Sequence, residues 1–237
     1  FNGRNSRGMN PASSIVLQAS IWVIPVLLAI TLHEAAHGFV ARLLGDDTAY
    51  RLGRVTLNPI KHVDLFGTIL LPAMLIFMGA SFIFGYAKPV PVDFANLRKP
   101  KRDMFWVALA GPAANLLMAV IAAILLYATP IMPESFASWW IEMLSVGIHL
   151  NIILAVFNLL PILPLDGGRM LVGVLPRPYA MLYTRTERYG FLALIGLIFI
   201  LPLIADAFGV FFHPLAAILL PVVSWLTELL LVVLGFG

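Results

Sequence analysis

Five long apolar stretches limit this chain to one kind of fold. Each is long enough to cross the ~30 Å hydrocarbon core of a bilayer as a helix, which takes about 20 residues. Of the 237 residues, 61% are hydrophobic and 11% are charged, whereas soluble domains have about 25% charged residues. We therefore expect an all-α polytopic membrane protein with five full transmembrane helices, at residues 12–44, 104–128, 137–160, 189–205 and 210–234.

A sixth apolar stretch, residues 65–84, is interrupted by Pro72 and Gly79 and could be a sixth span or a re-entrant segment. Lysine and arginine collect on the cytoplasmic side of membrane proteins. A re-entrant hairpin places 13 of the 15 basic residues on one side, whereas a full span divides them 11 to 4. The charge pattern therefore favours the hairpin, with the N-terminus outside.

The motif His33-Glu34-Ala35-Ala36-His37 lies inside the first apolar stretch. A charged side chain at the centre of a bilayer costs ~2.5–3.5 kcal/mol, so such groups persist where a partner or a metal offsets the cost. The spacing of four residues places both imidazoles on one helical face, where they can bind one ion. Glu34 occupies the position of the general base in metallohydrolases. A buried histidine pair or a proton relay is the alternative.

Asp166 is the candidate third ligand. It follows the span at 137–160, beyond Pro161 and Pro164, and precedes two glycines that we expect to give the backbone freedom to aim the carboxylate. To reach the histidines, the first and third spans must run in the same direction. Two nitrogens and one oxygen with an open position are typical of catalytic zinc, so we expect one Zn²⁺ per chain. A helix N-cap is the other role open to Asp166.

Two asparagines and a proline-rich segment are candidate substrate contacts. Asn158 and Asn115 can hold a substrate backbone or an oxyanion, or can bond between helices. Residues 50–58 and 85–93 predict a small membrane-associated β-region, in which Val90 and Val92 lie near an edge that an extended substrate can join. An irregular proline loop is equally compatible with this segment.

Together these motifs resemble the site-2 protease family of intramembrane zinc metalloproteases. The resemblance rests on HEAAH, GPAAN, GYAKPVPV and NLLPILPLDGG in this order. It implies zinc on His33, His37 and Asp166, Glu34 as catalytic base, Asn158 near the substrate, and cleavage of a transmembrane protein such as a membrane-tethered regulator. We expect a minimal form without inserted PDZ or CBS domains, in a prokaryotic inner membrane, with the active site toward the cytoplasm.

One membrane-embedded domain over residues 1–237 accommodates these features. We expect a flexible N-terminus at 1–11, a catalytic core at 31–175 and C-terminal helices at 189–234. The absence of cysteine excludes disulfides and thiolate ligands, and basic residues beside the spans fit membrane lipid contact rather than nucleic-acid binding. A zinc transporter or a non-catalytic zinc-binding scaffold is the alternative function, and neither needs a base at Glu34.

Overall fold

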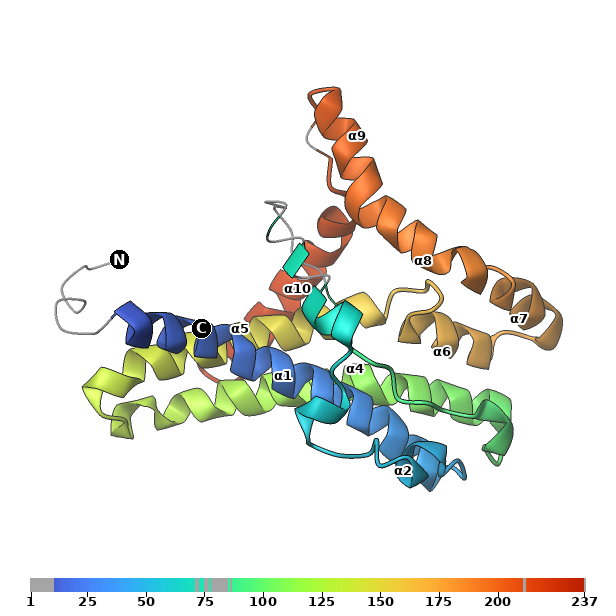
Figure 1. The fold of residues 1–237 in the computed structure, drawn as a ribbon, viewed down its shortest axis with the longest axis horizontal. Coiled ribbons are helices and arrows are strands. Elements are labelled where there is room, and N and C mark those ends of the chain that lie inside the picture. The colour runs from blue at the N-terminus through green and yellow to red at the C-terminus, as the bar shows by residue number, and fades with distance from the viewer. Residues whose placement is uncertain are drawn as a thin grey trace.

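Long helices dominate the structure, a computed structural model that describes residues 11–70, 73–74, 77, 85, 87–210 and 212–236 (Figure 1). Within these described residues, five helices are long and apolar enough to cross a membrane. This confirms the all-helical membrane fold predicted from the sequence. The elements in chain order are α1 Pro11–Leu43, α2 Thr48–Arg51, η1 Pro59–Lys61, η2 Leu65–Leu70, η3 Phe94–Asn96, α4 Pro100–Leu125, η4 Leu126–Ile131, α5 Glu134–Asn158, α6 Asp166–Val174, α7 Arg177–Thr184, α8 Glu187–Ile195, η5 Gly196–Ile200, α9 Leu201–Ala207 and α10 Pro214–Val233.

Local chemistry sets the helix ends. Gly45 has φ +118°, and the next amide, of Asp46, bonds to the Ala41 carbonyl at 2.9 Å, which closes α1 as a C-terminal glycine does. Helix α4 begins four residues earlier than predicted, because Pro100 suits a first helical position and the Asp103 carboxylate accepts the Lys99 amide at 2.7 Å. A polar first turn conceals such a start from a hydropathy pattern.

Helices α1 and α5 run in the same direction, with α4 antiparallel beside them (Figure 1). Near the starts of α1 and α5, the Trp139 indole donates to Ser20 Oγ at 2.9 Å. Near their ends, Asp166 lies 3.3 Å from His37. The parallel arrangement required by the sequence argument is therefore confirmed.

Among the described residues, the largest buried hydrophobic cluster lies where α4, α5 and α10 meet. Alanines on α4 let the helix axes approach closely, as small residues do in membrane bundles. Helices α8 and α9 extend away from the α1–α4–α5 bundle (Figure 1). The buried cluster comprises Ala119, Ala122, Ala123, Leu144, Ile148, Ile152 and Val223.

The predicted β-region was wrong for the residues that the structure describes. Within 50–58 the chain forms the end of α2, turns and bends, and residues 87–93 form neither helix nor strand. Pro89 and Pro91 have no amide hydrogen, and the Val90 amide binds a side chain instead of a neighbouring strand. Most of the predicted re-entrant segment at 65–84 lies outside the described residues, and its described start is a π-helical turn at η2.

Candidate metal centre and active site

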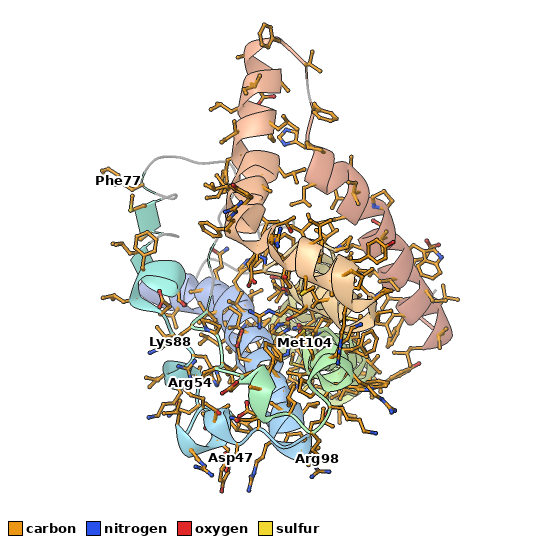
Figure 2. All side chains as sticks on the ribbon, turned by 90° about the vertical axis from the view of Figure 1, so that its right-hand side faces the viewer. Asp47, Arg54, Phe77, Lys88, Arg98 and Met104 are labelled. Atoms are coloured by element: carbon orange, nitrogen blue, oxygen red, sulfur yellow. The ribbon has the colours of Figure 1, made fainter. Side chains whose placement is uncertain are left out.

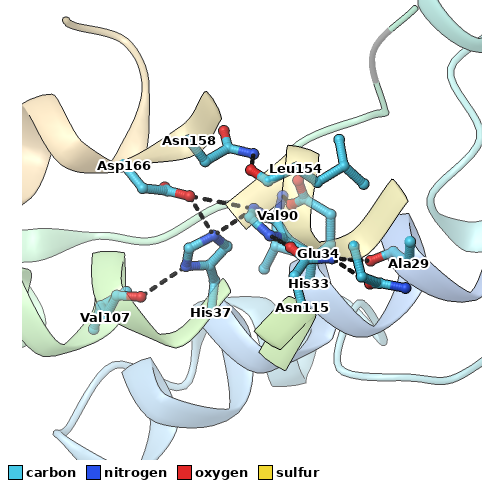
Figure 3. Close-up of polar contacts among 11 residues, drawn as sticks. Ala29, His33, Glu34, His37, Val90, Val107, Asn115, Leu154, Asn158 and Asp166 are labelled. Carbon is cyan, nitrogen blue, oxygen red and sulfur yellow. Dashed lines mark hydrogen bonds and ion pairs between the residues drawn. The ribbon is translucent and has the colours of Figure 1, made fainter. Parts of the chain in front are cut away.

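His33 and His37 of α1 meet Asp166, the first residue of α6 (Figure 3). The two Nε2 atoms lie 3.1 Å apart, and Asp166 Oδ2 lies 3.2 Å from His33 Nε2 and 3.3 Å from His37 Nε2. Both histidines are only 9% exposed. Ligand atoms bound ~2.0–2.1 Å from a tetrahedral zinc ion are ~3.3 Å from one another, so this triangle has the dimensions of three zinc ligands.

Hydrogen bonds behind each imidazole turn its Nε2 lone pair toward this point. His37 Nδ1 donates to the Val107 carbonyl at 2.7 Å, because that oxygen can only accept. His33 Nδ1 lies 2.6 Å from Asn115 Oδ1. The orientation of Asn115 is fixed in turn, because its amide nitrogen donates to Asn151 Oδ1 at 2.8 Å and Asn151 donates to the Gly147 carbonyl at 2.8 Å.

Two lone pairs and a carboxylate oxygen therefore converge, which is repulsive without a cation. Asp166 Oδ2 is a buried atom without a hydrogen bond. Burial raises the pKa of Asp166, but the imidazoles of His33 and His37 beside the carboxylate outweigh it, so the pKa of this carboxyl lies below its usual range. Two nitrogens and one oxygen, each oriented by its surroundings, fit a zinc ion with an open coordination position.

The position of Asp166 rules out the N-cap role. It is the first residue of α6, after the cap residue Leu165, and its carboxylate faces the histidines. The prediction that Gly167 and Gly168 provide conformational freedom was wrong, because neither has a positive φ. They are needed for their small size: a Cβ at Gly167 would lie 2.2 Å from the Leu159 carbonyl oxygen, and one at Gly168 would lie 2.6 Å from the Leu163 nitrogen.

Glu34 lies beside the ligands but is not one of them. Its Oε2 accepts the backbone N–H of Val90 at 2.7 Å (Figure 3). A cavity of about 150 Å³ is lined by the three ligands, Glu34 and other groups. Among the predicted contacts, Asn158, Val90 and Val92 line this cavity. Asn158 also donates to the Leu154 carbonyl at 3.0 Å, and its catalytic role stays a prediction.

Asn115 has a different position from the one expected of a substrate contact. It is completely buried and lies between His33 and Asn151, behind the metal ligands. It therefore orients a ligand, the role that carbonyls and carboxylates often have beside metal-binding histidines. Asn151, which extends this chain, was missed from the sequence, although a polar residue at mid-span is itself a signal.

Gly111 and Arg169 were also missed as parts of the site. A Cβ at Gly111 would lie 2.4 Å from His37 Nε2 and 2.7 Å from His33 Nε2, so only glycine leaves room for the imidazoles. Arg169 lines the cavity one turn after Asp166, with its guanidinium carbon 5.6 Å from the centre of the Phe94 ring. The GPAAN and LDGG motifs contain or adjoin both residues, but only the packing reveals what they contact.

A membrane-embedded helical bundle with a buried two-histidine, one-carboxylate centre and an adjacent glutamate defines a zinc metallopeptidase of the membrane class. Residues 21–137 and 128–203 match the sequence model of Peptidase family M50. The chain belongs to this family, which confirms its resemblance to the site-2 proteases.

Named relatives agree with this assignment. "Putative zinc metalloprotease YwhC" of Bacillus subtilis is 40% identical over 185 residues, which are 76% of this chain and 80% of that protein. "Putative zinc metalloprotease Rip2" of Mycolicibacterium smegmatis is 31% identical over 73% of this chain and 64% of its own length. "Zinc metalloprotease MJ0392" of Methanocaldococcus jannaschii is 24% identical over 71% of this chain and 39% of its own length. No solved structure matches the chain.

Proposed function

We propose that this protein is an intramembrane protease that hydrolyses a peptide bond within or near the transmembrane segment of another membrane protein. The observation that carries the proposal is the placement of Glu34 beside three converging ligand atoms, on a helix long enough to cross the bilayer. Membership of a zinc metallopeptidase family supports the same chemistry. A purely structural zinc site would need no unbound carboxylate at its edge.

Zinc, when bound, supplies a Lewis acid that polarises the substrate carbonyl and lowers the pKa of water toward ~7. The chain's own residues transfer the proton and bind the substrate. Glu34 takes a proton from the attacking water and delivers it to the leaving amide nitrogen. Asn158, on the wall of the same cavity, donates a hydrogen bond to the substrate backbone or the developing oxyanion.

A transmembrane substrate hides its carbonyls in helical hydrogen bonds, so it must unwind before attack. In this proposal the unwound segment lies along residues 90–92, whose valines line the cavity. Backbone pairing there replaces part of the hydrogen bonding that the helix loses. A membrane-tethered regulator with one span is the substrate class that fits.

The proposed setting is a prokaryotic inner membrane with the metal centre toward the cytoplasm. The support is the distribution of basic residues, 13 of 15 on one side when residues 65–84 do not cross. Arg98 lies where α1 ends and α4 begins, because its backbone N–H donates to the Leu44 carbonyl at 3.0 Å. That end would face the anionic inner leaflet.

Cleavage should depend on how easily the substrate helix unwinds. We expect a single-span substrate with a Gly-Pro pair near the scissile bond to be cleaved at least about 10-fold faster than the same span made of leucine, since Gly and Pro weaken a helix by ~1 and ~3 kcal/mol. The rates are measured in proteoliposomes with Glu34→Gln protein as the inactive reference. Equal rates for the two spans would contradict the unwinding step.

A further inference from the structure

The general base is held by a backbone group from a distant part of the chain. Val90 N–H donates to Glu34 Oε2 at 2.7 Å, across 56 positions of sequence. A carboxylate has two oxygens, and this bond occupies only Oε2. The contact therefore fixes the direction of the carboxylate while Oε1 can still accept a proton.

The proline segment, residues 87–93, is not part of a sheet, so no strand pairing holds the Val90 N–H in place. The buried side chain of Arg54 holds it instead. The Arg54 Nη2 atom donates to the Lys88 carbonyl at 2.7 Å and lies 3.4 Å from the Pro89 carbonyl. The Lys88 amide in turn donates to the His62 carbonyl at 2.9 Å. Figure 2 shows Arg54 and Lys88 next to each other on the same side of the molecule.

Arg54 is only 8% exposed, and its charge is bound by carbonyl oxygens. Among the described residues no carboxylate lies within ion-pair distance of it. A buried cation without an anion is costly and contributes little to stability compared with an apolar side chain. Arg51, three residues earlier, is exposed and paired with Asp47 at 2.7 Å, which is the ordinary arrangement.

The other end of the proline segment is fixed independently. Asp46 is fully buried and accepts the Asp93 amide at 2.8 Å and the Asn96 side-chain amide at 3.1 Å. On α1, one turn after Glu34, Gly38 leaves room for this segment: a Cβ there would lie 3.0 Å from Val90 and 2.9 Å from Val55. The Val90 amide is thus held between two fixed points, at Arg54 and Asp46.

We infer that Arg54 is a positioning residue for the general base: by binding the Lys88 and Pro89 carbonyls it holds the Val90 amide against Glu34 and so aims the carboxylate at the metal centre. This inference rests on the proposed proteolytic function. It assigns Arg54 a role in turnover rather than in substrate binding or zinc binding, because Arg54 is absent from the cavity wall and from the ligand group.

The test compares Arg54→Met with Arg51→Met, which removes the same charge from a solvent-exposed position nearby. We expect Arg54→Met to lower kcat about 10- to 100-fold, the range for losing a hydrogen bond that involves a charged group, with KM within about 2-fold and zinc content unchanged. Arg54→Lys should recover part of kcat, since an ammonium group can still bind a carbonyl. Arg51→Met should behave as wild type.

A second variant, Val90→Pro, removes the Val90 amide hydrogen that donates to Glu34. Its effect on kcat should match that of Arg54→Met, and the double variant should be no worse than either, because both act through one hydrogen bond. The inference is overturned if Arg54→Met matches or exceeds wild-type kcat, or if the two effects multiply. Failure of the wild type to cleave, or cleavage by Glu34→Gln, would instead remove the proposed function and this role with it.

Discussion

Glu34→Gln is expected to abolish proteolysis while leaving zinc bound. Glutamine has nearly the same shape and can still accept the Val90 amide, but it cannot take a proton from water. General acid–base catalysis contributes ~10²- to 10⁴-fold, so we expect a loss of kcat of that size. Zinc content should not change, because Glu34 is outside the ligand group of His33, His37 and Asp166. Cleavage of a single-span substrate and metal analysis on the same preparation measure both effects.

Glu142→Gln is the matched control, since Glu142 is an exposed carboxylate on α5 and is not part of the cavity wall. It should cleave as wild type does. A Glu34→Gln variant with wild-type activity would contradict the role of the base. Zinc movement across the membrane by a wild type that cleaves nothing, unaffected by Glu34→Gln, would support the transporter.

Gly111→Ala is the second change with a large expected effect. The added methyl would lie 2.4 Å from His37 Nε2, and the imidazoles cannot easily retreat, because Val107 and Asn115 hold them by their Nδ1 atoms. One imidazole must leave its position, which breaks the ligand triangle. We expect zinc affinity and kcat/KM each to fall at least about 100-fold, a loss at the upper end of that seen when the groups orienting a metal ligand are removed.

Gly147→Ala is the control for this substitution. A Cβ at Gly147 would make only ordinary contacts, the nearest at 3.8 Å from Pro25. It should retain zinc and activity, with a melting temperature close to that of wild type. Normal zinc binding by Gly111→Ala, measured by competition with a chelator of known affinity, would show that the histidines do not occupy the positions described above.

The spans and the metal ligands could be predicted from the sequence because both follow from local periodicity and length. Apolar runs mark α1, α4, α5, the α8–α9 pair and α10 to within a few residues. The spacing of His33 and His37 places both on one face of the helix. If residues 65–84 do not cross the membrane, the first and third spans run in the same direction, which puts Asp166 on the same side of the membrane as the histidines. The histidine pair is then the expected partner of the Asp166 carboxylate, which lies between the third and fourth spans.

What the sequence could not reveal depends on contacts between distant segments. A proline-rich segment near β-forming residues looks like a sheet edge, yet here its amide bonds to Glu34. Asn115 could equally face a substrate or a ligand until α1 and α5 are placed on either side of it. Gly111 and Gly168 are both conformationally ordinary, and their importance appears only when the atoms that a Cβ would displace are known.

The central claim is that one zinc ion is held by His33, His37 and Asp166, and metal analysis combined with X-ray absorption of the purified full chain tests it most directly. We predict about one zinc per chain, with two nitrogen ligands and one carboxylate oxygen at ~2.0–2.1 Å, and a large loss of zinc in Asp166→Ala. Protein that remains metal-free after purification in zinc-containing buffers, or that binds zinc equally tightly without Asp166, would contradict the account.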